Sequence, residues 1–138
     1  MTMTPTQKIK WLVLDKAAQW RKEDPPPYPC DDVDELFAAA EGSDEICDAL
    51  YDALGDVRAS GEDTDIETKG WNRNYECKSI AAQLPDGSWV GWTYWYGGGK
   101  HGEPQNVPWM EDAYDVTMRE EKRVVRVFAK SDGVRDGE

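Results

Sequence analysis

Residues 75–96 read YECKSIAAQLPDGSWVGWTYWY, and this stretch decides the fold of the second half of the chain. At its centre, Pro85-Asp86-Gly87-Ser88 is a strong turn signal, because proline fixes one backbone dihedral angle and glycine accepts a positive one. The segments on either side, residues 75–84 and 89–96, can pair as antiparallel strands across that turn. The sequence therefore predicts a β-hairpin here.

The second strand of this hairpin has two different faces, because successive side chains of a strand point to opposite sides of the sheet. One face carries Trp89, Thr93 and Trp95, and the other carries Val90, Trp92, Tyr94 and Tyr96. Three helices can cover one face but not both. We therefore expect the face of Trp92, Tyr94 and Tyr96 to be partly exposed and to bind a partner, as aromatic protein interfaces do. The alternative is that both faces are buried, one of them beneath residues 103–114.

A second hairpin is predicted from residues 116–120 and 123–130, where RVVRVF at positions 123–128 is the clearest strand signal of the chain. Between the two hairpins, GGGKHGEP at positions 97–104 is expected to be a long flexible loop. Residues 108–114 are expected to form a helical turn or an irregular crossing. Residues 131–138 are predicted to be a frayed tail.

The first half of the chain is predicted to be helical. Thr4 followed by Pro5 is typical of a helix start. Residues 7–22 then place their apolar side chains on one face of a helix. Four prolines between positions 25 and 29 end this helix and predict a stiff connection to the next one.

Two shorter helices are predicted next, before a polar, acidic loop at residues 60–68. The first is capped by Asp31 or Asp32, and the second is capped by Ser43 and runs to about residue 58. Three helices followed by two hairpins make an α+β chain, with the helices packed on one antiparallel sheet of about four strands. A length of 138 residues fits a single domain, which we expect to span residues 1–130.

Charge is distributed unevenly along the chain. The net charge is −12, and residues 31–67 alone carry 14 acidic side chains and a single basic one, Arg58. A field of this sign repels nucleic acid and anionic membranes and attracts basic proteins. Direct binding to DNA or RNA is therefore not expected. The sequence offers neither a membrane-spanning run nor a signal core, so the protein is expected to stay in the cytosol.

Four aspartates recur every four residues of the third predicted helix: Asp44, Asp48, Asp52 and Asp56. They lie on the side of the helix opposite an apolar stripe of Ile46, Leu50 and Leu54. We predict that the aspartates are exposed and the stripe is buried. Successive charges would lie about 6 Å apart, within a factor of two of the phosphate spacing in one DNA strand. With Glu45 beside them, these aspartates are candidate partner-binding residues.

Three accounts of this acidic surface remain open. The surface can mimic nucleic acid and occupy a basic groove of another protein, with Asp32, Glu35 and Glu41 extending it. It can also be a solvated helix face that keeps the protein soluble, or an adaptation to high salt. Like charges four residues apart repel each other, so helix propensity did not select this arrangement.

The glycine-rich loop carries Lys100 and the chain's single histidine, His101. Glycines next to a lysine can hold an anion, but a P-loop places Ser or Thr after its lysine, and His101 stands there. We therefore interpret the loop as a mobile connection. Residues 63–68 begin like a calcium-binding loop but lack the glycine required at its sixth position.

Three cysteines, Cys30, Cys47 and Cys77, lack the paired spacing of a metal or redox site and are expected to be reduced and structural. One histidine and scattered carboxylates form no recognisable catalytic constellation. The sequence therefore predicts a binding protein without a metal or cofactor rather than an enzyme.

Residues 91–128, with the segments GWTYWYGGGKHG, WMEDAY and RVVRVF, resemble small accessory proteins of bacteriophages and prophages. The resemblance implies an inhibitor of host defence, of the anti-CRISPR kind or directed against a restriction enzyme, in the bacterial cytoplasm. Together with the charge, it predicts binding to a basic nucleic-acid-binding groove by DNA mimicry. Two alternatives stay open. One is a module that binds a small ligand or nucleotide through Trp92, Trp95, Lys100 and His101. The other is a phage structural or regulatory protein that forms dimers through its aromatic sheet.

Overall fold

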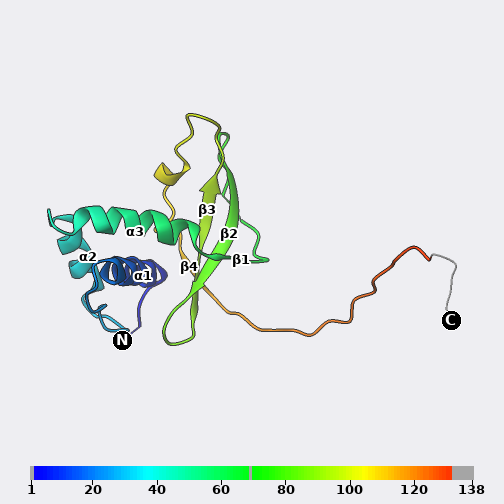
Figure 1. Ribbon diagram of the computed structural model, residues 1–138, viewed down its shortest axis with the longest axis horizontal. Coiled ribbons are helices and arrows are strands. Elements are labelled where there is room, and N and C mark those ends of the chain that lie inside the picture. The colour runs from blue at the N-terminus through cyan, green and yellow to red at the C-terminus, as the bar shows by residue number, and fades with distance from the viewer. Residues whose placement is uncertain (1, 69, 132–138) are drawn as a thin grey trace.

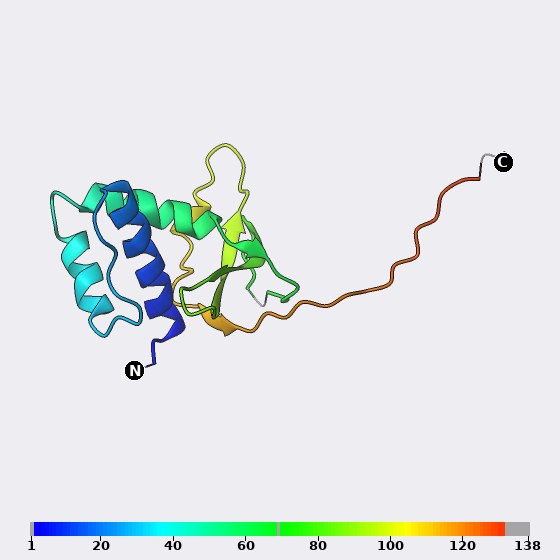
Figure 2. The ribbon, with the colours of Figure 1, turned by 60° about the horizontal axis from the view of Figure 1, so that its bottom comes forward.

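The computed structural model describes residues 2–68 and 70–131 as three α-helices, one short 3-10 helix and a four-stranded antiparallel sheet. In chain order these are α1 (Pro5–Trp20), α2 (Val33–Glu41), α3 (Cys47–Ala59), β1 (Glu62–Asp63), β2 (Glu76–Gln83), β3 (Trp89–Tyr96), η1 (Pro104–Asn106) and β4 (Tyr114–Val116). The helices gather on one side of the sheet (Figures 1 and 2). The predicted α+β class, with helices before sheet, is confirmed.

Helix α1 begins as its sequence predicts. The Thr4 hydroxyl accepts a hydrogen bond from the Gln7 backbone N–H at 3.2 Å, and the Gln7 side chain accepts one from the Thr4 N–H at 2.9 Å. These two bonds satisfy N–H groups that have no partner inside the helix. Pro5 occupies the first turn, where its missing N–H costs nothing.

The proline-rich connection folds back along α1. The indole N–H of Trp11 donates to the carbonyls of Pro26 and Pro27 at 3.1 and 3.0 Å. The Trp11 ring also meets the ring of Tyr28 edge-on, with centroids 5.2 Å apart. These contacts hold residues 26–28 against the helix, so α2 starts from a fixed position beside α1.

Helix α3 begins later than its sequence predicts. The predicted cap, Ser43, makes no capping bond from its side chain; its backbone carbonyl accepts the Cys47 N–H at 2.9 Å. Residues 44–46 form a turn, and the regular helix starts at Cys47. Asp32 likewise precedes α2 without a side-chain capping bond. The local sequence therefore predicts that these two helices exist but not how they begin.

The hairpin of β2 and β3 is confirmed in full register, from Gln83 opposite Trp89 to Glu76 opposite Tyr96. In its turn, the Leu84 N–H donates to the Ser88 carbonyl at 2.8 Å. Gly87 has a φ angle of 88°, which side chains disfavour. The turn residues that predicted the hairpin therefore also form it.

The outer strands of the sheet come from unexpected segments. β1 arises within the predicted acidic loop and pairs with β2 through two residue pairs, Glu62 with Ala81 and Asp63 with Ile80. β4 arises at the end of the predicted crossing and pairs with β3 from Gly91 to Trp89. The strand order is β1-β2-β3-β4.

The second predicted hairpin is not formed, and this correction has a geometric reason. The last residue of β4, Val116, lies opposite Trp89, the first residue of β3. Beyond Trp89 the sheet offers only the turn, so residues 117–131 run past its end and form no strand. The first of them, up to Arg123, line a groove beside β1, and the chain then extends away from the body of the molecule (Figures 1 and 2). Of the predicted frayed tail, only residue 131 lies within the described residues.

The core lies between the sheet and helices α1 and α3, with Trp92 at its centre. Trp92 has no exposed surface, and its ring lies 5.6 Å from that of Trp109. Its indole N–H donates to the Arg58 carbonyl at 3.0 Å. Ile9 of α1 and Leu50 of α3 belong to the same buried cluster. This core fixes which side of α3 faces solvent.

Candidate functional site

Helix α3 presents a row of carboxylates to solvent. Asp48, Asp52 and Asp56 are exposed, whereas Leu50 and Val57 are buried on the other side of the helix. Four-residue steps advance about 6 Å along the axis and rotate little around it, which keeps the three charges on one side. The predicted exposure of these aspartates is confirmed, and so is the burial of Leu50. Ile46 and Leu54 are only partly buried.

Asp44 and Glu45 extend the acidic surface but do not belong to the regular helix. Both are exposed and lie in the turn that precedes α3. The helical spacing derived from the sequence therefore applies to three aspartates instead of four. We call Asp48, Asp52 and Asp56 the α3 acidic row.

Few cations of the described residues neutralise this row. Within the described residues, the one ion pair of the row joins Asp56 to Lys16 of α1, at 3.3 Å. Asp34 of α2 provides a contrast. It binds the Gln7 and Lys10 side chains at 3.0 and 2.9 Å, and these bonds hold the pKa of its carboxyl below its ordinary value. Asp34 is thus engaged within the fold, whereas Asp48 and Asp52 face solvent.

Tyr51 is a member of this surface that the sequence analysis missed. It lies between Asp48 and Asp52 in the chain, and about half of its side chain is exposed. Exposed tyrosines often contribute strongly to protein interfaces, since one end of the ring is apolar and the other forms hydrogen bonds. Its place one residue before Asp52, off the apolar stripe, is the sequence signal that could have identified it.

The prediction that Trp92 belongs to an exposed aromatic interface is wrong. The alternation of β3 is as predicted, but the helices cover the face of Trp92, so this residue is buried and cannot contact a partner. Tyr94 and Tyr96 lie farther along the same face and are only partly buried. Their rings stack with centroids 5.6 Å apart. Alternation assigns side chains to faces, but only tertiary packing decides which face is covered.

Arg58, the single base of the acidic region, is built into the fold. It is buried, its guanidinium donates to the Trp95 carbonyl at 2.9 Å, and it lies 4.9 Å from the centre of the Tyr94 ring. Lys78 approaches the same ring at 6.0 Å and binds Asp63 at 2.9 Å. Both cations therefore support the sheet, and neither has an ion pair with the α3 acidic row within the described residues.

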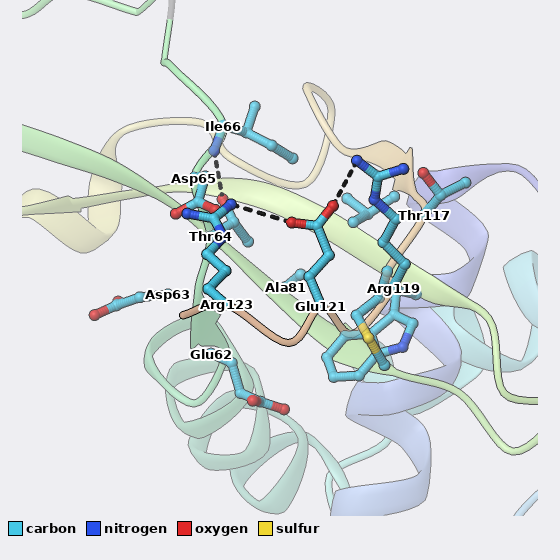
Figure 3. A pocket seen from close by; sticks show the side chains of 13 residues that line it. Glu62, Asp63, Thr64, Asp65, Ile66, Ala81, Thr117, Arg119, Glu121 and Arg123 are labelled. Carbon is cyan, nitrogen blue, oxygen red and sulfur yellow. Dashed lines mark hydrogen bonds and ion pairs between the residues drawn. The ribbon is translucent and has the colours of Figure 1, made fainter. Parts of the chain in front are cut away.

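The other face of the sheet is grooved rather than flat. One groove of about 520 Å³ lies between the acidic residues of β1, the apolar side chains of Ile66, Ala81 and Trp89, and the chain that follows β4 (Figure 3). A second groove of about 530 Å³ is lined by Thr93, Trp95 and Tyr114, among others. Ser79 and Tyr114 are joined there by a hydrogen bond between their hydroxyls. Loop residues therefore cover this face only in part.

The conformation of the glycine-rich loop depends on three glycines with positive φ and on a hydrogen bond to Tyr75. Gly97, Gly98 and Gly99 all have φ between 74° and 88°. The Tyr75 hydroxyl accepts a hydrogen bond from the Glu103 N–H at 2.9 Å. Lys100 and His101 are exposed at the tip, and neither lines the grooves of the sheet. The residues proposed for a small ligand, Trp92 and Trp95 among them, are thus not brought together around one groove.

Replacing Gly98 by Ala should destabilise this loop more than replacing Gly99 by Ala. Both positions share the left-handed backbone cost of about 1 kcal/mol. At Gly98, however, a Cβ atom would lie 2.4 Å from the Tyr75 ring, whereas Gly99 has nothing within 4 Å. Overpacking of this kind adds about 1–3 kcal/mol. Urea unfolding of both variants measures the difference, and equal midpoints would contradict the contact.

The three cysteines are free thiols in different surroundings. Cys30 is buried, and this burial raises the pKa of its thiol. The hydrogen bond that its sulfur donates to the Asp32 carboxylate, at 3.2 Å, raises the pKa further. Cys47 and Cys77 are partly exposed. Within the described residues, no group of three or more His, Cys, Asp or Glu is arranged to hold a metal ion.

Cys30 should react with a thiol reagent more slowly than Cys47 and Cys77 in the folded protein. Its raised pKa leaves little thiolate at neutral pH, and thiolate is the reactive form. Mass spectrometry of timed labelling gives the three rates, and labelling in urea provides the unfolded control. Equal rates in the native protein would show that Cys30 is accessible.

None of the helices in residues 2–68 and 70–131 is long and apolar enough to cross a membrane. Comparison of the chain with protein-family models, with curated proteins and with solved structures gives no significant match.

Proposed function

We propose that this protein binds a basic, nucleic-acid-binding protein of a bacterial host and blocks the groove that normally holds nucleic acid. A host defence nuclease, such as a CRISPR effector, is the target class that the sequence resemblance implies. The observation that carries the proposal is the α3 acidic row. Its three aspartates are exposed on one side of a helix, and two of them lack an ion-pair partner among the described residues.

The spacing and setting of the row fit a surface that takes the place of phosphates. Its charges are about 6 Å apart, against about 3.4 Å for phosphates along one DNA strand, so each carboxylate can meet a basic side chain spaced for every second phosphate. Glu35, Glu41 and Glu45 are also exposed and add to the same field. A concentrated negative potential speeds encounter with a basic groove. The helix supplies rigid spacing that a disordered acidic segment lacks.

Tyr51 gives this surface an apolar anchor beside the charges. A purely ionic contact is weak at physiological salt, because exposed charges are screened beyond about 8 Å. A half-exposed aromatic ring can be desolvated in the interface and stabilise the complex independently of salt. We therefore assign the partner-binding surface to the α3 acidic row together with Asp44, Glu45 and Tyr51.

The test is capture of the partner from a bacterial lysate on the immobilised protein, followed by competition with DNA. The expected result is a basic nucleic-acid-binding protein that is retained at low salt, is released at high salt, and is displaced by added DNA. Displacement matters because it shows that both ligands need the same groove. A partner that holds DNA and this protein at the same time, or whose binding is insensitive to salt, would contradict mimicry.

A further inference from the structure

The chain beyond β4 combines strong strand character with exposed side chains. We call residues 117–131 the C-terminal arm. Four of its large apolar side chains, Val124, Val125, Val127 and Phe128, are between 72% and 102% exposed. A group of exposed apolar side chains of this kind is typical of an interaction site. The first residues of the arm, up to Arg123, line a groove beside β1, and the chain then extends away from the body (Figures 1 and 2).

The arm cannot continue β4 along β3 in its own sheet. β4 is in register with β3 only as far as Val116, because Trp89 opposite it is where β3 begins. An extended backbone needs a neighbouring strand to satisfy its hydrogen-bonding groups away from water, and strand propensity alone does not supply one. A strand that pairs with the arm would therefore come from a different edge than that of β3.

The charge of the arm indicates which kind of surface it can bind. It carries five basic and two acidic side chains, whereas residues 1–116 carry 23 acidic and 10 basic ones. The arm is thus a basic segment with apolar side chains, attached to a strongly acidic body. A second copy of this chain offers the complementary acidic body, and a two-fold arrangement allows each copy to give and to receive an arm.

The edge at β1 fits this strand best. β1 is an edge strand that pairs only with β2, so the backbone groups on its outer side have no neighbouring strand, and an edge strand can pair with a strand from another chain. The groove beside it combines the acidic side chains of Glu62, Asp63 and Asp65 with the apolar side chains of Ile66, Ala81 and Trp89, and the first residues of the same chain's arm, up to Arg123, also line it. In Figure 3, Arg123 of the same chain already points toward Thr64 and Asp65. A basic side chain of the arm is therefore compatible with this groove.

We propose that two copies of this chain exchange arms, with residues 123–128 of each adding as an antiparallel strand along residues 62–66 of the other. Alternation would send Arg123, Val125 and Val127 to one face of the strand, and Val124, Arg126 and Phe128 to the other. Backbone hydrogen bonds hold such an added strand, and alternate side chains select its partner. This dimer is independent of the function proposed for α3, whose acidic row lies on a different element.

The first measurement is the mass of the full-length protein in solution by sedimentation equilibrium. The expected mass is twice the 15.6 kDa of one chain. A monomer at every soluble concentration would overturn the proposal. Hydrogen exchange on the same sample should find the amides of residues 124–128 protected. A monomer with protected arm amides would place the arm on its own chain and would also overturn it.

Charge reversal gives the decisive test. Arg123→Glu with Arg126→Glu puts an acidic arm against an acidic edge, and Glu62→Lys with Asp65→Lys puts a basic edge against a basic arm. Each double variant alone should raise the dissociation constant of the dimer by about tenfold or more. Mixing the two variants should restore a dimer, because each arm then meets an edge of opposite charge. Dimers unaffected by either variant, or no recovery on mixing, would overturn the proposal.

A pair of proline substitutions tests strand addition itself. Neighbouring residues of a strand point their N–H groups to opposite sides, and an added edge strand is bonded on one side only. Val124→Pro and Val125→Pro should therefore differ: the one that removes a bonded N–H should weaken the dimer markedly more than the other. Equal, small effects of both would show that the arm contacts its partner through side chains alone, and would overturn strand exchange.

Discussion

Replacing Asp48 and Asp52 together by Asn should weaken binding to the proposed nucleic-acid-binding partner by roughly a hundredfold at low salt. Each substitution keeps the shape of the side chain and removes one charge-assisted contact, worth about 1.5 kcal/mol or more. The fold should be unaffected or slightly more stable, because two like charges four residues apart no longer repel each other. Affinity measured at low and high salt should converge for the variant and the wild type, since added salt screens the charges that distinguish them.

A matched control separates a specific surface from overall charge. Glu111→Gln with Asp112→Asn removes two exposed charges from the segment between η1 and β4, away from α3. If the α3 acidic row contacts the partner, this control should bind nearly as tightly as the wild type. If only the net charge matters, both double variants should weaken binding equally.

The aromatic alternative predicts the opposite pattern. Tyr96 is partly exposed and stacks on Tyr94, so Tyr96→Ala would be the most damaging change if the end of β3 were the interface. Salt would then have little effect on affinity. Wild-type affinity for the double Asn variant at low salt, combined with a large loss for Tyr96→Ala, would refute DNA mimicry and support an aromatic interface.

Replacing Trp92 by Ala should reduce the free energy of unfolding by about 3–5 kcal/mol, which is a large share of the usual total. Trp92 is fully buried, packs against Trp109 and donates its indole N–H to the Arg58 carbonyl. The substitution leaves a cavity at the junction of sheet and helices, and it leaves that carbonyl without its donor. Urea unfolding followed by circular dichroism measures the change without depending on tryptophan fluorescence.

Two further variants make this prediction testable even if Trp92→Ala does not fold. Trp92→Phe fills part of the space but lacks the N–H, so a loss of about 1–3 kcal/mol is expected from the unsatisfied carbonyl. Trp71 is 82% exposed, and Trp71→Ala should change stability by no more than about 0.5 kcal/mol. Equal unfolding midpoints for the Trp92 and Trp71 variants would mean that Trp92 is not at the centre of the core.

The helix start at Thr4, the turn at Gly87 and the spacing of the α3 acidic row were all determined by the sequence. Each depends on residues within a few positions of one another: a hydroxyl three residues from an N–H, a proline and a glycine in one turn, and carboxylates one helical turn apart. Local energies select these structures, so local patterns predict them.

Tertiary structure alone decided which face of β3 is covered, which segments flank the hairpin, and what becomes of residues 117–131. Alternation gave Trp92 and Trp95 opposite faces, but the packing of α1 and α3 buried the Trp92 face. The short β1, from the predicted acidic loop, pairs with β2. The strongly strand-like residues 123–128 remain unpaired, because β4 has already reached the first residue of β3, Trp89, at Val116. Strand pairing joins residues far apart in the chain, and its outcome depends on which edge is within reach.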